Sequence, residues 1–191
     1  TGVQTCALPI SGYAYNSASE VFGSTFIGLG AGTATTGHDN GFFGSQSGYN
    51  NTTGNYNTAV GSAALQQNTT ASNNTAVGYQ AGYSNQTGTY LTAVGYQALY
   101  SNTGNWNTAV GDSVLYANTS GVGNAGFGTV SLASNTTGSY NSAFGGANRA
   151  ANKGPLYSNT TGSYNTAFGA ESLGNNTTAS YNTAEIGRAH V

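Results

Sequence analysis

Side chains able to do acid–base chemistry are sparse in this chain of 191 residues, of which only 4% are charged. Glycan hydrolysis needs two carboxylates within roughly 5 to 9.5 Å of each other. Asp112 and Glu171 are separated by about three of the chain's repeating units and an insertion, on the order of 14 Å at about 4.8 Å per unit. The carboxylates therefore predict no hydrolytic site, and we expect no enzymatic activity.

His38 next to Asp39 could form a base with its orienting carboxylate. Adjacent residues of an extended segment point apart, so we expect both to be solvated turn residues. Scattered carboxylates, one histidine in the body of the chain and one cysteine, Cys6, match no common ligand pattern. We therefore predict neither a metal site nor a cofactor.

Aromatic side chains recur at regular intervals, and their faces can stack on sugars. One set directly precedes the start of each repeat and supplies the candidate glycan-stacking residues Tyr56, Tyr90, Trp106, Tyr140, Tyr164 and Tyr181. A second set, in a later register, comprises Tyr49, Tyr83, Tyr100 and Tyr116. The alternative, which we favour, is that stacked rings stabilise neighbouring coils or line a contact between chains.

Threonine and asparagine recur with the same spacing. A hydroxyl ladder that could bind ice comprises Thr58, Thr75, Thr92, Thr108, Thr166 and Thr183. Because these residues share a face with Val60 and its equivalents, we expect an interior or interfacial ladder instead. Stacked asparagines can hydrogen-bond along a solenoid, so a scaffold role is predicted for Asn57, Asn74, Asn107, Asn141, Asn165 and Asn182.

These residues belong to a repeat of about seventeen residues. Its five-residue core reads Asn57-Thr58-Ala59-Val60-Gly61 and recurs from Asn74, Asn107, Asn141 and Asn165. Turn-forming Asn-Thr-Thr-Gly segments and a Leu separate the cores, so each unit reads strand, turn, strand, turn. We assign to the interior one column with a large apolar residue in every unit, at Ile27, Phe43, Val60, Val77, Val94, Val110, Phe127, Phe144 and Phe168, beside a column at Leu65, Leu99, Leu115, Leu132 and Leu173.

The predicted architecture is an all-β parallel β-solenoid, or β-roll, of roughly nine coils. Parallel stacking at about 4.8 Å per coil makes a rod near 43 Å long. Two sizeable apolar side chains per coil make a thin core, which association would thicken. We therefore expect a homotrimer.

Both ends differ in composition from the body. Residues Ala7 to Ile10 can be encoded by GCTCTTCCGATC, and its reverse complement encodes Ile186 to Arg188; the string resembles an adapter of sequencing libraries. We expect foreign segments at 1–10 and 185–191, an irregular lead-in at 11–23 and one solenoid domain at 24–184. An insertion near 146–157 holds Arg149, Lys153 and Pro155; it is interpreted as a loop, with a docking site as the alternative.

The Asn-Thr-Ala-Val-Gly cores at Asn57, Asn74 and Asn107, with their Ala-Leu and Asn-Thr-Thr-Gly elements, resemble head repeats of trimeric autotransporter adhesins. They also look like repeat stems of phage tail fibres. The resemblance covers nearly all of 24–184 and implies a left-handed, trimeric β-roll. It further implies cell adhesion or host recognition from an extracellular site, on a bacterial surface or a virion tail.

The expected partners follow from charge and from this resemblance. Two basic residues in the body, Arg149 and Lys153, cannot supply the cluster that nucleic acid or acidic lipid requires. No apolar run is long enough to span a membrane. We expect a structural and adhesive fibre segment that meets a host-surface glycan or protein, with a repetitive-ligand binding module for glycan or ice as the alternative.

Overall fold

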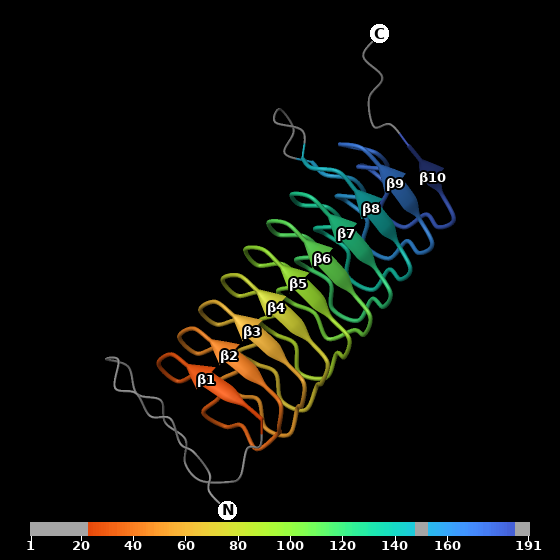
Figure 1. Ribbon diagram of the computed structural model, residues 1–191. Coiled ribbons are helices and arrows are strands. Elements are labelled where there is room, and N and C mark those ends of the chain that lie inside the picture. Colours follow the sequence, from red (N-terminus) through yellow and green to blue (C-terminus); the bar gives the residue numbers. More distant parts are fainter. Residues whose placement is uncertain (1–22, 148–152, 186–191) are drawn as a thin grey trace, which may run out of the picture.

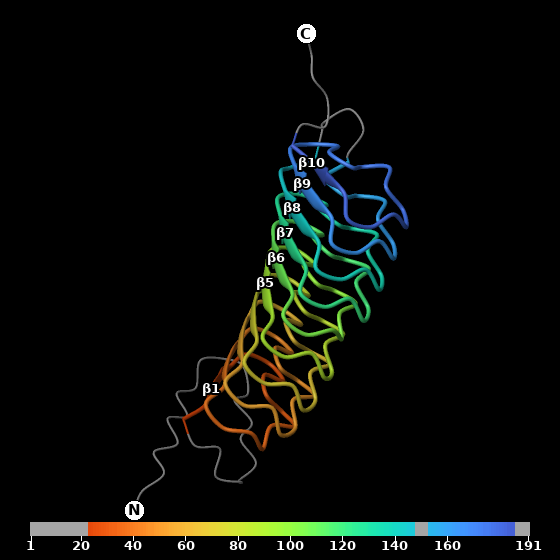
Figure 2. The same ribbon diagram turned by 90° about the vertical axis from the view of Figure 1, so that its right-hand side faces the viewer.

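The computed structural model describes residues 23–147 and 153–185, and these form one parallel sheet of ten strands. The strands are β1 (Thr25–Ile27), β2 (Gly41–Phe43), β3 (Thr58–Val60), β4 (Thr75–Val77), β5 (Thr92–Val94), β6 (Thr108–Val110), β7 (Ala125–Phe127), β8 (Ser142–Phe144), β9 (Thr166–Phe168) and β10 (Thr183–Ala184). They lie in sequence order along one side of a rod, and the turns form the other sides (Figures 1 and 2). The second strand predicted for each unit was wrong: the segment that holds its leucine, such as 62–67, is a turn, with Leu65 in left-handed backbone at φ +49°. The predicted all-β parallel solenoid is confirmed; its left-handed sense stays a prediction.

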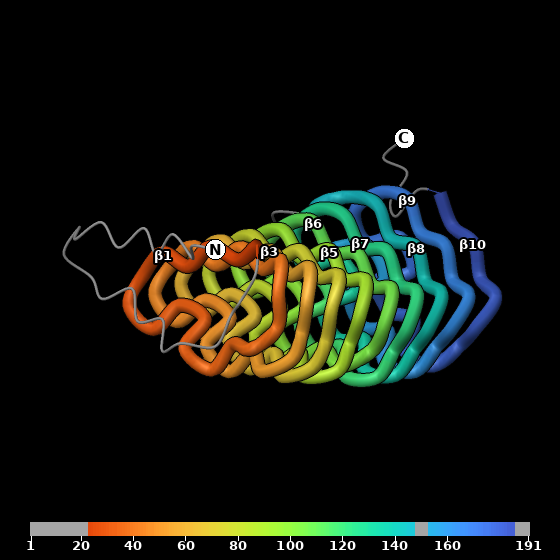
Figure 3. The backbone as a smooth tube through the Cα atoms, turned by 60° about the horizontal axis from the view of Figure 1, so that its bottom comes forward, coloured from red at the N-terminus to blue at the C-terminus, as the bar shows by residue number. Residues whose placement is uncertain are grey.

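Each strand pairs in register with the equivalent strand of the next coil. Thr58 is opposite Thr75, Ala59 opposite Ala76 and Val60 opposite Val77. Successive turns are also paired by backbone hydrogen bonds, such as the one that Thr52 N–H donates to the Thr69 carbonyl at 2.8 Å. Equivalent residues therefore form columns along the rod, as the stacked loops of Figure 3 illustrate.

The interior is built from the alanine of each core and the leucine that follows it. Ala59, Ala76 and Ala109 are completely buried, and Leu65 and Leu99 are at most 1% exposed. The Leu column was correctly predicted as interior. The Val60 column was not: Val60 is 38% exposed and Ile27 60% exposed, because the strand turns its alanine, not its valine, inward.

The alanine side faces inward because the coil is narrow. Where the alanine is replaced by a larger residue, the facing leucine position becomes glycine. Phe42 fills the interior of its coil completely, and a Cβ at Gly48 would lie within 2.5 Å of the Phe42 ring. In the described coils at most one of the two positions holds a large side chain, since interiors are packed close to crystal density. In the coil of Ala76 and Gly82 neither does, and Leu65 of the preceding coil reaches toward Gly82.

Buried asparagines hold the rest of the interior together, as predicted. Asn57 accepts a bond from the backbone N–H of Asn74 at 3.1 Å and donates to the Ala71 carbonyl at 2.9 Å. A second buried column begins at Asn51, which accepts from the Asn68 side chain and donates to the Gly54 carbonyl at 3.0 Å. These amides satisfy turn carbonyls that would otherwise be buried without a partner.

The corners of the coil use left-handed backbone. Gly61 has φ +129°, and a Cβ there would lie 2.5 Å from the Gly78 carbonyl oxygen, so only glycine fits. Non-glycine residues also adopt positive φ, among them Tyr56 at +57° and Leu65 at +49°. These strained positions persist because the hydrogen bonds of adjacent coils hold them.

The inserted segment between β8 and β9 is shorter than predicted. Pro155 accepts a backbone bond from Leu132 at 3.1 Å, and Leu156 is fully buried and donates to Ser172 at 2.9 Å, so both residues already belong to the coil. Arg149 and both predicted foreign segments, except Glu185, lie outside the described residues. In the described ranges, no helix has the length and apolarity to cross a membrane.

Candidate ligand-binding surfaces

The first predicted aromatic set lies on the outside of a corner. We call it the Tyr56 column; its side chains are between 49% and 79% exposed and comprise Tyr56, Tyr90, Trp106, Tyr140, Tyr164 and Tyr181. Each of these residues adopts a positive φ, which directs its side chain outward while the next residue, an asparagine or Leu91, points inward. Judged by their exposure, these rings are therefore accessible to a ligand.

Ring stacking covers many of those faces. Tyr140 stacks on Tyr164 with 5.2 Å between centroids, and Tyr164 stacks on Tyr181 at 5.0 Å. At Gly123, where the aromatic is missing, the Tyr140 ring lies so close that a Cβ would meet it at 2.7 Å. The stacking favours a role in holding neighbouring coils together over sugar binding at this end of the column.

The second aromatic set lies on another side, six residues after the last residue of β2, β4, β5 and β6. Tyr83 stacks on Tyr100 at 5.0 Å, and Tyr100 on Tyr116 at 5.1 Å, with the rings nearly parallel. Partial burial, and then the neighbouring hydroxyls of Tyr83 and Tyr116, raise the pKa of Tyr100. The rise follows because a phenolate there would lose water contacts and meet like charge.

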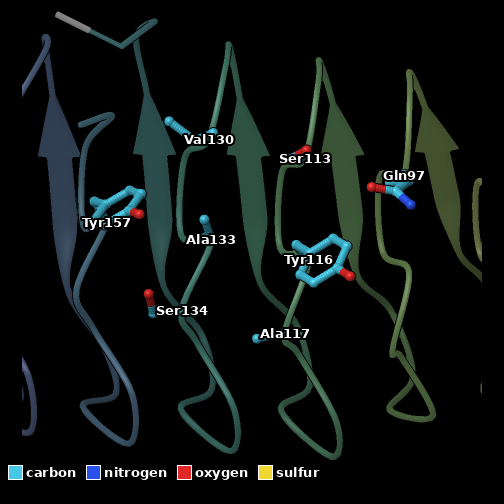
Figure 4. Close-up of a pocket in the computed structure, with 8 residues that line it drawn as sticks. All are labelled: Gln97, Ser113, Tyr116, Ala117, Val130, Ala133, Ser134 and Tyr157. Carbon is cyan, nitrogen blue, oxygen red and sulfur yellow. The ribbon is translucent and has the colours of Figure 1, made fainter. Parts of the chain in front are cut away.

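A shallow groove of about 460 Å³ opens beside this second set (Figure 4). It is lined by Gln97, Ser113, Tyr116, Ala117, Val130, Ala133, Ser134 and Tyr157. Tyr157 was not among the predicted aromatic residues, because the insertion moves it out of the seventeen-residue spacing. The signal was present: Leu156-Tyr157 repeats the Leu99-Tyr100 pair.

The outer face of the sheet carries the threonine ladder. Thr58 and Thr75 are exposed and alternate with Val60 and Val77, which are 38% and 36% exposed. Of the two predicted placements of these hydroxyls the interior one was wrong, for the same reason as that of the Val60 column; the interfacial one stays a prediction. Within one chain the face presents hydroxyl and apolar columns side by side.

The possible acid–base residues are arranged differently from expectation. His38 Nδ1 and Asp39 Oδ2 are 2.8 Å apart, so these neighbours do not point apart. Asp39 has φ +56°, which turns its carboxylate back toward the ring. Both side chains are nearly half exposed, and the His38 ring meets the edge of Tyr56 at 5.3 Å. The pair thus lies on an open surface.

The carboxylates lie in separate coils. Asp112 follows β6 and accepts a bond from the Ser113 hydroxyl at 2.7 Å, whereas Glu171 follows β9. Among the described residues no three His, Cys, Asp or Glu side chains gather where they could hold a metal ion.

Comparison of the chain with protein-family models, with curated proteins and with solved structures finds no match.

Proposed function

We propose that this chain is a structural and adhesive segment of an extracellular fibre, in which the solenoid rod associates with two further copies and carries or spaces attachment sites. The bacterial surface and the virion tail are the two settings that its repeats suggest. The observation that carries the proposal is an outward apolar column that runs the length of an unbroken parallel sheet.

The column has the character of an interface between chains. Its members are large and apolar but face outward, with Ile27 at 60%, Phe168 at 44% and Val60 at 38% exposed. Contiguous apolar surface of this kind marks association sites in soluble proteins. Phe127 stacks on Phe144 at 4.8 Å and Phe144 on Phe168 at 5.0 Å, so the column forms a continuous ridge.

Association around this ridge also thickens a thin core. Inside each described coil the two facing positions together hold at most one large side chain, as at Leu65 opposite Ala59. Three such ridges meeting on a common axis would bury the apolar column of every coil. The threonine hydroxyls beside it would hydrogen-bond across the same contact.

Sedimentation equilibrium of the full chain under reducing conditions tests the proposal. We expect a species of three times the 19.2 kDa chain mass. Replacing Val60→Lys together with Val94→Lys places charge in the ridge and should weaken association by about a hundredfold or more, because buried unpaired charge is costly.

The matched control is Thr53→Lys with Thr87→Lys, which adds the same charge at exposed turn positions of coils two apart, away from the sheet. It should leave the mass unchanged. A wild-type chain that sediments as a folded monomer, or equal loss of association in both double variants, would contradict the ridge as the interface.

The exposed threonine ladder supports a second candidate function, ice binding. Thr58 and Thr75 lie in register on a parallel sheet. At one end of the sheet the stacked phenyl rings of Phe144 and Phe168 lie on the same face. Thermal hysteresis at micromolar chain concentration would support this function, and its absence would remove it.

A further inference from the structure

Two positions of the second aromatic set lack a ring, Gln66 and Ala133. We call the positions the Tyr100 column: Tyr49, Gln66, Tyr83, Tyr100, Tyr116, Ala133 and Tyr157. Backbone bonds show the common register, since the residue after each position donates to the equivalent position in the next coil: Ala117 to Ala133 at 3.0 Å, and Ser134 to Tyr157 at 3.1 Å. Ala133 therefore stands where the three preceding coils carry tyrosine.

The gap has the thickness of one ring. Stacked members of the column are 5.0 and 5.1 Å apart. Tyr116 and Tyr157 are two coils apart, which gives about 10 Å between them at the spacing of parallel strands. A six-membered ring placed over the Ala133 methyl would lie about 5 Å from each tyrosine, a normal separation for contact with an aromatic face.

Other breaks in the tyrosine column are occupied by side chains of the protein. Gln66 occupies the position between Tyr49 and Tyr83, and its amide donates to Gln46 at 3.0 Å. On the far side of Tyr157, Lys153 Nζ lies 6.0 Å from the ring centroid and donates to Asn175 of the next coil at 2.9 Å. Ala133 contributes one methyl group, and the groove opens at that point (Figure 4).

The rim of the groove is polar and uncharged. Ser113 and Ser134 flank the gap with hydroxyl groups and Val130 adds apolar contact, whereas Gln97 lines the groove one coil beyond Tyr116 (Figure 4). The Ser113 hydroxyl is bonded to the Asp112 carboxylate at 2.7 Å, which places negative charge near the rim. Two aromatic faces with a hydroxyl-rich rim suit a neutral ring with apolar faces and polar edges; the carboxylate disfavours an anionic one.

We propose that the slot between Tyr116 and Tyr157 binds one pyranose unit of a neutral glycan, sandwiched over Ala133 with its hydroxyls at the Ser113 and Ser134 rim. This inference deepens the attachment role proposed above and rests on it. It moves the glycan-binding residues from the Tyr56 column to the Tyr100 column.

Saturation-transfer NMR of the full chain with maltohexaose, cellohexaose and chitohexaose tests the slot. At least one of the three should bind, and transfer should be strongest to protons of one internal residue. Ala133→Gln gives the slot the filler that Gln66 provides elsewhere and should weaken binding at least about tenfold. Gln66→Ala should create a second slot, between Tyr49 and Tyr83, and increase the number of sites.

Tyr90→Asn is the control, because Asn73 occupies the same position one coil earlier with the same left-handed backbone. It should leave binding unchanged. Failure of all three oligosaccharides to bind, unchanged binding by Ala133→Gln, or loss of binding by Tyr90→Asn would each overturn the slot. Stronger binding of p-nitrophenol than of any oligosaccharide would overturn the choice of ligand.

The same samples separate this proposal from the fibre proposal. Circular dichroism and thermal melting should show that Ala133→Gln folds as the wild type does, and sedimentation should show an unchanged mass. Glycan binding by a chain that sediments as a monomer would support the slot and contradict the proposed fibre assembly. A trimer that binds none of the sugars would support the assembly and contradict the slot.

Discussion

At the scale of single residues, buried asparagines stabilise this narrow solenoid through hydrogen bonds, where a wider protein would rely on a larger hydrophobic core. Asn107 is fully buried; its side chain donates to the carbonyl of Gly121 at 2.7 Å and to Asn102 at 2.9 Å, and accepts from the backbone N–H of Asn124 at 2.9 Å. One side chain thus joins its own coil to the next one. Because buried polar groups left without partners are costly, the ladder makes each coil dependent on the next.

We expect Asn107→Ala to lower the free energy of unfolding by about 2 to 3 kcal/mol, since it leaves buried carbonyl and N–H groups unpaired. Urea denaturation followed by circular dichroism measures the change. Asn175→Ala is the control, because Asn175 is exposed and contacts Lys153; it should change stability by no more than about 0.5 kcal/mol. If both variants lost the same free energy of unfolding, the buried asparagine ladder would contribute no more to stability than an exposed asparagine does.

At the scale of the coil, the size of the side chain that the strand points inward is matched by the size of the facing side chain from the turn. Phe42 faces Gly48 in one coil, whereas Ala109 and Leu115 fill the same two positions in another. The inward direction of the alanine was readable in principle: that position is small in most coils, while the valine position varies from Val to Phe. The prediction placed the more hydrophobic valine column inside, which was wrong, because a narrow coil has room only for the smaller alanine side chain at this position.

Ala109→Phe should overpack its coil and lower the free energy of unfolding by about 1 to 3 kcal/mol. Leu115→Gly alone should lower it by about 3 kcal/mol or more, since it leaves a cavity. The double variant should lose less than the sum of the two, because it reproduces the Phe42–Gly48 arrangement. Additive losses in a urea-based double-mutant cycle would contradict volume exchange.

At the scale of the whole molecule, low charge and an exposed apolar ridge are the surface features on which the proposed assembly rests. With 3 basic and 5 acidic residues in 191, electrostatic forces between copies are weak. The proposed interface consists of valine, phenylalanine, threonine and backbone.

Association of the rod should therefore change little between about 0.05 and about 1 M sodium chloride, over which charge–charge contacts would be screened. Sedimentation equilibrium at both salt concentrations measures this. A trimer that dissociates as salt rises would place charged residues in the contact and would contradict assembly through the ridge.

The sequence by itself determined the parallel solenoid, its period, the leucine and asparagine columns and the strand at each core, because identical residues at a fixed spacing must stack in register. The second strand that it suggested around each leucine is a turn, because the backbone there adopts positive φ, as at Leu65. Alternation separated the two faces of each strand but did not say which face is inside. Only the tertiary structure decided that, since closure of a narrow coil depends on side-chain volume across the interior. It also brought Tyr157 into line beyond Ala133, because the spacing did not locate the residue at which the coil resumes after the insertion.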